Sequence, residues 1–184
     1  MSQYYLISQL PSLDGISEAV PLPITEERFL ELCSRFLSKK SLLELNSLTL
    51  IPPKSPQSVN SPLLESWYTV ERNLRLALGK SRAEKLNKSF DFDNITLPTE
   101  LLQTARTAVE FDSPLEAERF LNNYRLKVLE LLRPMDTFSE DYLFYYGIKL
   151  KLILRIREFD KTRGQAAYRN IYDSVINRAE SEVE

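Results

Sequence analysis

Histidine is absent from this chain of 184 residues, and its absence excludes several catalytic mechanisms. Neither a Ser-His-Asp nor a Cys-His arrangement can be built without an imidazole to act as the general base. The usual zinc sites are excluded as well, because they need cysteine or histidine ligands in number. We therefore expect no metal site and no cofactor.

Cysteine is nearly absent too, since Cys33 is the only one, and the chain therefore cannot form an internal disulfide. Cys33 lies at helical spacing among Phe29, Leu32, Phe36 and Leu37. A free cysteine in such surroundings usually behaves as a small core residue. We expect Cys33 to be buried; the alternative is a reactive thiol, for which the chain offers no activating histidine.

Long hydrophobic runs are also missing. No apolar stretch reaches the length of about 18 residues that would predict a helix spanning a bilayer. The N-terminus lacks a basic start followed by an apolar block, so no export signal is predicted. The formal net charge is only −2, which gives no overall field toward nucleic acid or membrane. We expect a cytoplasmic protein, peripheral to the inner membrane only through a partner.

Motifs that bind phosphate or carry a nucleophile are absent. The sequence contains no GxxxxGK[ST], GxGxxG or GxSxG pattern, so nucleotide binding and hydrolase chemistry have no positive support. The carboxylate pairs Glu116/Glu118 and Asp91/Asp93 do not fit the twelve-residue calcium loop, and we interpret them as solvated surface. The sequence predicts a protein that is not an enzyme.

What the chain does contain is one segment, 141–164, with a dense run of large apolar residues. Read as a helix, this segment is apolar around most of its circumference and must be covered on several sides. Lys151, Arg155 and Glu158 step by about one turn, which leaves a single polar stripe. We predict that this segment is the central helix of the fold.

Helix start signals surround this segment. Thr25, Ser61, Thr99 and Ser113 each stand where an N-cap is expected, and proline follows Ser61 and Ser113 at the first helical position. Only 4 glycines occur in the chain. The predicted fold is all-α, a multi-helix bundle of about six helices with helical hairpins, and an N-terminal extended arm or short strand at 4–10. The expected helices cover about 25–39, 62–87, 99–110, 114–133, 139–164 and 165–179. Residues 89–98 are expected to form a loop that Phe90 and Phe92 anchor into the core.

We expect residues 1–184 to form a single helical domain. The proline-rich stretch at 52–62 (PPKSPQSVNSP) cannot propagate a helix or a central strand, so it is a loop and a candidate subdomain boundary. The openings SPL at 61–63 and SPL at 113–115 resemble each other. Either a helical hairpin has been duplicated, or both helices share the same capping chemistry.

Charge is segregated along the chain although the total is nearly balanced. Residues 71–88 and 149–169 are mostly basic, whereas residues 89–119 are mostly acidic. These blocks either pair inside the fold or present a basic face to an acidic protein partner. Nucleic acid is not predicted as a partner, because no recognised binding motif accompanies the basic blocks.

Aromatic residues next to the basic blocks have two interpretations. At helical spacing they fill a core, and if exposed they would anchor an interface. The predicted partner-binding residues combine both features, and they are Trp67, Tyr68, Arg72, Arg75, Arg82, Tyr145, Lys149, Lys151 and Arg155. Charge reversal at Lys151 and Arg155 is predicted to leave folding nearly intact and to weaken assembly with a partner.

The linear order of these segments resembles a known family over nearly the whole chain. The resemblance is carried by YYLISQLPSL at 4–13, FLELC at 29–33, WY at 67–68, ERNLR at 71–75, RAEKL at 82–86, SPLEAERFL at 113–121, and the Tyr146-x-x-Lys149-Leu150-Lys151 run that ends in Arg155. It is an uncharacterised bacterial family whose genes lie among those for V/A-type ATPase subunits.

This resemblance implies a role in a rotary ATPase. The helical hairpins, rich in arginine and tyrosine, are similar in style to the V/A-type ATPase C (d) subunit, an all-helical funnel that seats the central stalk on the membrane rotor ring. The chain is about half the length expected for that subunit, so a shortened coupler and an assembly factor both fit. The implied partners are the stalk and rotor-ring subunits, and the family brings no catalytic residues. The alternative is a cytoplasmic helical scaffold or regulatory adaptor, for which a homodimer is considered.

Overall fold

The computed structural model describes residues 2–16, 20–53, 61–90, 96–158 and 161–181. Within these ranges the chain forms eight α-helices and no β-strand, which confirms the predicted all-α class. The helices are α1 (Ser2–Gln9), α2 (Glu26–Ser34), α3 (Lys39–Asn46), α4 (Pro62–Lys85), α5 (Thr99–Glu110), α6 (Pro114–Leu131), α7 (Glu140–Glu158) and α8 (Lys161–Ser181).

Three of the predicted N-caps are present. The side-chain oxygens of Thr25 and Ser61 each accept a hydrogen bond at 3.2 Å from the backbone N–H three residues further on. Ser113 does the same at 3.4 Å. Proline occupies the first position of both α4 and α6, where its missing N–H would have had no helical partner. Local capping chemistry therefore fixes where these helices begin.

Three predictions about element ends are wrong. The expected arm or strand at 4–10 is instead mostly helical, because α1 directs Leu6 fully into the core and tertiary packing outweighs the β-preference of the local sequence. Gly164 does not end the central helix; α7 ends at Glu158, and Gly164 lies inside α8, as glycine only weakens a helix. Thr99 is the first residue of α5 rather than its cap.

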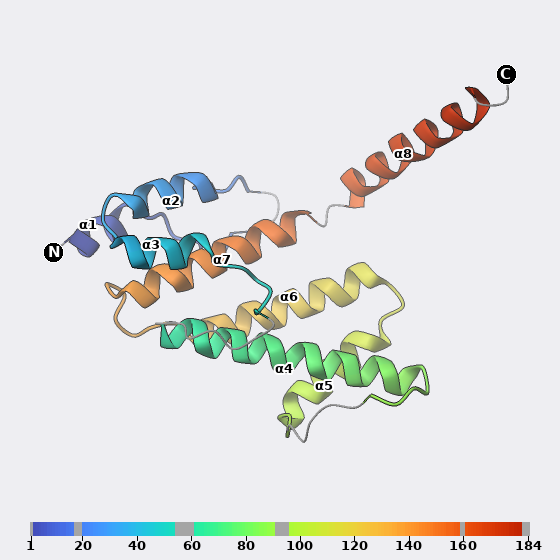
Figure 1. Cartoon of the computed structure of the whole chain (residues 1–184), viewed down its shortest axis with the longest axis horizontal. Helices are drawn as coiled ribbons and strands as arrows, with labels where there is room; N and C mark the ends of the chain where they lie inside the picture. Colours follow the sequence, from blue (N-terminus) through green and yellow to red (C-terminus); the bar gives the residue numbers. More distant parts are fainter. Residues whose placement is uncertain (1, 17–19, 54–60, 91–95, 159–160, 182–184) are drawn as a thin grey trace.

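The predicted central helix is confirmed as α7. It packs against α2 and α3 on one side and against α4 and α6 on the other (Figure 1). All residues from 143 to 150 are buried. At Gly147 the side chains of Leu48 and Phe29 lie close to the α7 backbone, since a Cβ atom built there would be 3.1 Å from Leu48 Cδ2 and 3.3 Å from Phe29 Cε1.

The buried apolar residues form two clusters. The first joins α1, α2, α3 and α7 with the start of α4 and the end of α6, and it includes Trp67 and Leu129. The second joins the rest of α4 with α5 and the start of α6, and it includes Leu74 and Leu121. Leu48 and Leu63, on either side of the 52–62 stretch, belong to the same cluster. The division between the two clusters falls within α4, and most of the 52–62 stretch, the candidate subdomain boundary, lies outside the described residues.

Two further features complete the architecture. α8 extends away from the other helices, with the C-terminus at its far end (Figure 1). Phe90, predicted to anchor its loop, lies against α4, with its ring 2.8 Å from where a Cβ on Gly79 would stand, although its side chain is 40% exposed. Phe92, the other predicted anchor, lies outside the described residues.

Candidate functional site

Four of the predicted partner-binding residues point into the protein interior. Trp67 is fully buried, and Tyr68, Tyr145 and Lys149 are each less than a tenth exposed. These four side chains are therefore buried in this conformation, and their role as contact residues stays a prediction. The aromatic rings remove large apolar areas from water, and they therefore fill the core between α4, α6 and α7.

Lys149 is buried because carboxylates reach it from two other elements. Its Nζ donates to Glu130 Oε1 at 2.6 Å, to the Tyr145 hydroxyl at 3.3 Å, and to Asp14. Burial alone would lower the pKa of Lys149, but these acceptors outweigh it and raise the pKa above its usual value. The hydrogen bond with Lys149 lowers the pKa of Asp14. The lysine is therefore a charged, structural group that ties the 11–16 segment to α6 and α7.

Tyr145 and Arg133 complete this cluster. The Tyr145 hydroxyl donates to Glu130 at 2.8 Å, and burial, followed by this hydrogen bond, raises the pKa of Tyr145 to about 12. The Arg133 guanidinium lies 5.9 Å and 5.8 Å from the ring centres of Tyr142 and Tyr145, within the range of cation–π attraction. A cavity of about 190 Å³ lies beside these side chains. Its wall carries both signs of charge, so it does not select for one ligand class.

A second buried ionic cluster lies between the two apolar clusters. Arg125 Nε donates to Glu71 Oε1 at 2.5 Å, and Arg125 Nη1 donates to Asn122 Oδ1 at 3.0 Å. Glu118 lies 3.4 Å from Arg125 and 2.5 Å from Arg155. This set of side chains links α4, α6 and α7, and we call it the ionic seam: Glu71, Glu118, Asn122, Arg125 and Arg155.

Arg155, in the basic 149–169 block, is bonded to Glu118, in the acidic 89–119 block. Lys151 is bonded to Glu26, which lies outside the acidic block, and Arg75 lies 3.5 Å from Glu71 within its own basic block. Pairing between blocks is therefore seen at Arg155, and a basic face for an acidic partner stays a prediction. Arg72 is half-buried, whereas Arg82 is exposed. Of the predicted contact residues, Arg82 is the exposed one for which the structure shows a cavity alongside.

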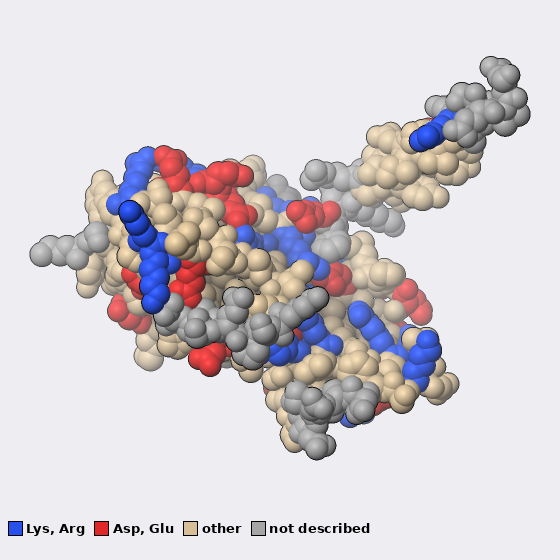
Figure 2. Space-filling view, viewed as in Figure 1, with Lys and Arg blue, Asp and Glu red and all other residues tan. Residues whose placement is uncertain are grey.

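That cavity is a groove where α4 and α5 end and α6 begins. It has a volume of about 440 Å³ and an apolar wall that includes Leu78, Ala108 and Leu121. The charged residues that line it are Arg82, Lys85 and Glu118, and the Glu118 carboxylate is already paired with Arg125 and Arg155. Lys85 Nζ donates to the Val109 carbonyl at 2.7 Å, which holds its charge beside the groove. Figure 2 shows Lys and Arg side chains at this end of the molecule. We call this feature the cationic groove.

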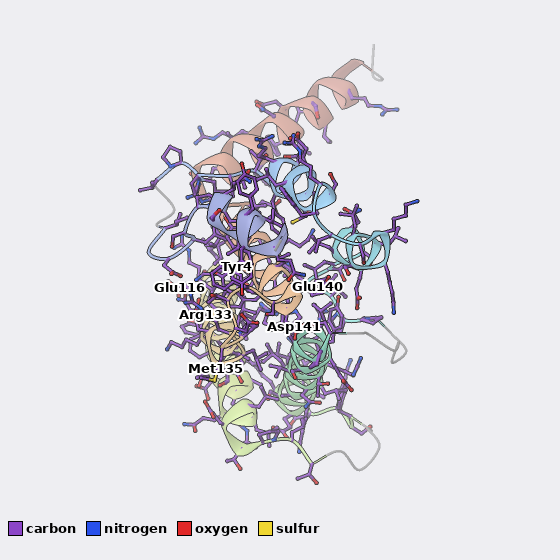
Figure 3. The ribbon with its side chains drawn as sticks, turned by 90° about the vertical axis from the view of Figure 1, so that its left-hand side faces the viewer. Tyr4, Glu116, Arg133, Met135, Glu140 and Asp141 are labelled. Carbon is purple, nitrogen blue, oxygen red and sulfur yellow. The ribbon has the colours of Figure 1, made fainter. Side chains whose placement is uncertain are left out.

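Two other exposed apolar surfaces were not predicted. At the end that faces the viewer in Figure 3, Tyr4 stacks on Phe138 with ring centres 4.2 Å apart, and Met135 is fully exposed. The other surface is α8, whose exposed aromatic and branched side chains are Tyr168, Ile171, Tyr172, Val175 and Ile176. Helical periodicity was the sequence signal for α8, but periodicity alone does not reveal that these apolar side chains are exposed rather than covered by another described helix.

Reactive and metal-binding groups were also sought in the part of the chain that the structure describes. Cys33 is fully buried, as predicted, and burial raises the pKa of its thiol to about 12. Among the described residues, no three Cys, Asp or Glu side chains gather to hold a metal ion. None of the described helices has the length and apolar character needed to cross a membrane.

Comparisons with protein-family profiles, with curated proteins and with solved structures found no match to this chain.

Proposed function

We propose that this chain is a non-catalytic subunit or accessory protein of a bacterial V/A-type rotary ATPase, where it couples the central stalk to the membrane rotor ring. The proposal rests on the family resemblance over nearly the whole chain, including the segments at 4–13, 71–75 and 113–121. An all-helical fold is compatible with a C (d)-like part of such a complex.

The observation that carries the proposal is the cationic groove. An apolar wall with Arg82 and Lys85 at its rim fits a segment that presents apolar side chains flanked by carboxylates. The recognition mode is that of an amphipathic helix laid into a groove, with the charges giving orientation and a faster encounter. We therefore assign an acidic, amphipathic helix of a stalk subunit as the occupant of the groove.

Affinity purification from the native membranes tests this function. The tagged chain should bring down stalk and ring subunits in a complex that survives moderate salt. Recovery of the chain alone, from membranes that contain an intact rotary ATPase, would contradict the proposal and leave the scaffold or adaptor alternative.

A charge-reversing variant tests whether the cationic groove is the docking site. Arg82→Glu should lower recovery of the ATPase subunits several-fold, because it reverses one rim charge without removing a packed side chain. Lys127→Glu is the matched control, since Lys127 is exposed on α6 and does not line the groove. Equal recovery with both variants would exclude the groove as the docking site.

A further inference from the structure

The C-terminal helix α8 carries an apolar stripe that is open to solvent. Tyr168, Ile171, Tyr172 and Val175 are 54–69% exposed, and Ile176 is 38% exposed. The rings of Tyr168 and Tyr172 stack with centres 6.2 Å apart, so the two aromatic residues share one face. A stripe of large apolar residues in this arrangement is typical of a helix that is covered by another surface.

The shape and charge of the stripe restrict what can cover it. At 100° per residue, the five side chains span roughly 140° of the helix circumference. Arg169 borders the stripe on one side and Arg178 on the other, while Asp173 lies one turn from Arg169 on the same side. The cationic groove of the same fold is a poor cover for this helix, because Arg82 and Lys85 at its rim would face the α8 arginines.

We propose that α8 pairs antiparallel with α8 of a second copy of this chain. Positions 171, 172, 175 and 176 are symmetric about the bond between Asp173 and Ser174. A twofold axis through that bond therefore places Ile171 against Ile176 and Tyr172 against Val175, in both directions. Such an isologous contact needs a surface complementary to itself, and the stripe has this property.

The charges beside the stripe are also self-complementary. In an antiparallel pair with this axis, each side of the stripe faces the same side of the other copy. Arg169 then lies within reach of Asp173 of the second copy, and the reverse contact forms by symmetry. The other side of the stripe carries Ser174 and Arg178, so it sets no like charges directly opposite each other. This complementarity is the reason for choosing a second copy as the occupant.

The exposed area of the stripe sets the expected stability of the dimer. Five side chains of up to about 200 Å² each, exposed to the fractions given above, offer roughly 500–600 Å² per copy. A standard interface buries about 800 Å² per partner. The dimer should therefore be weak and depend on concentration, and this inference is independent of the proposed ATPase role, because it leaves the cationic groove free.

Sedimentation of the full chain over low-micromolar to near-millimolar concentrations tests the pairing. We expect a monomer that shifts to a dimer as concentration rises. Ile171→Glu should raise the dissociation constant by at least about tenfold, since it buries a charge in the contact. Asn170→Glu adds the same charge on the opposite face and should leave the constant unchanged. A monomer throughout, or equal behaviour of both variants, would overturn the proposal.

Charge exchange tests the orientation. Arg169→Asp and Asp173→Arg should each weaken the dimer, and the double variant should restore it. Cross-linking gives a second readout because Cys33 is buried and stays silent. Val175→Cys should form a disulfide between the two copies. Tyr168→Cys should not, because the two copies of position 168 would lie about 16 Å apart along the helix axis. Cross-linking at position 168 would rule out the antiparallel pair. Binding of the full chain to anionic vesicles as a monomer, with no dimer in solution, would rule it out as well.

Discussion

Glu71 and Arg125 form a buried ion pair within the ionic seam. Glu71 is 1% exposed and Arg125 is 9% exposed, and they meet at 2.5 Å between the two apolar clusters. Burying charges is unfavourable unless each has a partner. The attraction between the two charges is largely offset by the free energy lost on removing both from water, so the intact pair adds little to stability. Removing one member is strongly destabilising, because the other charge is then buried without its partner.

Glu71→Ala should destabilise the protein by about 3–5 kcal/mol, because it leaves the Arg125 guanidinium buried beside fewer acceptors. Urea unfolding at neutral pH measures the change. Replacing both members by leucine should recover most of the loss, since two apolar side chains leave no uncompensated charge. A double variant as unstable as Glu71→Ala would show that the seam is needed for more than charge pairing.

Arg155 also belongs to the ionic seam, so its substitution is expected to affect folding. The sequence suggested that reversing Lys151 and Arg155 would leave folding nearly intact and weaken assembly. Because Arg155 is bonded to Glu118 and Lys151 to Glu26, we now expect Arg155→Glu to destabilise the fold by setting two carboxylates against each other. Thermal unfolding with Lys127→Glu as the control checks this, and an unchanged midpoint would contradict it.

The buried thiol and phenols predict that stability falls at alkaline pH. Burial raises the pKa of Cys33 to about 12 from an ordinary value of 9.0, and that of Tyr145 to about 12 from 10.0. Between these values the unfolded chain releases protons that the folded chain retains, so rising pH favours unfolding. Folding also raises the pKa of Lys149, which acts in the same direction. Its contribution to the free energy of unfolding is complete below its ordinary pKa of 10.5 and is lost as pH rises from there through the raised folded pKa.

Urea unfolding at several pH values tests this dependence. The free energy of unfolding should be nearly constant from neutral pH to about pH 9 and then fall steadily. Cys33→Val should remove the earliest part of the fall, because the thiol has the lowest ordinary pKa of the three groups. An identical profile for this variant would show that the thiol does not contribute.

At the scale of the helices, the two serine caps predict different costs. Ser113 is half-buried and accepts one backbone hydrogen bond, so Ser113→Ala should cost about 1 kcal/mol. Ser61 is 3% exposed and also donates to Asp141 Oδ1 at 2.5 Å, which ties the start of α4 to the start of α7. Ser61→Ala should therefore cost more, by about 1–3 kcal/mol for the buried acceptor left unpaired. Equal midpoints in urea would contradict this ranking.

Helix starts and the central helix were predictable because their signals are local. Serine followed by proline at 61–62 and 113–114 fixes two starts through capping, and the apolar density of 141–158 identifies α7. The same approach failed at Gly164 and at residues 4–10, where the neighbouring elements decide. Leu6 is buried through contacts with residues far away in the chain, and no periodicity within a seven-residue stretch reports them.

The candidate site was less predictable for a related reason. Lys149 and Tyr145 carry the residue types of an interface, but their partners Asp14 and Glu130 lie 135 and 19 residues away from Lys149. Only the packing of the 11–16 segment and α6 against α7 reveals that the lysine is internal. Arg82 is exposed because it lies near the end of α4, where none of the described helices covers it.

The described part of the molecule contains two apolar clusters spanned by α4 and α6, with the ionic seam between them. Two of its surfaces carry the proposed contacts: the cationic groove lies at the end of α4, and the apolar stripe lies on α8, a helix that extends away from the others (Figure 1). The two surfaces offer two independent contacts, one to an acidic partner and one to a second copy. A protein that links components of a larger assembly needs this separation.

Binding of the purified chain to the isolated rotary ATPase of the same organism tests the central claim most directly. With the ATPase immobilised and the chain titrated at two salt concentrations, we predict saturable binding that weakens as salt rises, because rim charges contribute to it. Arg82→Glu should weaken binding by about tenfold, while Lys127→Glu should match the unmodified chain. Absence of saturable binding at high micromolar concentration, or binding that ignores both salt and Arg82→Glu, would contradict the proposed role.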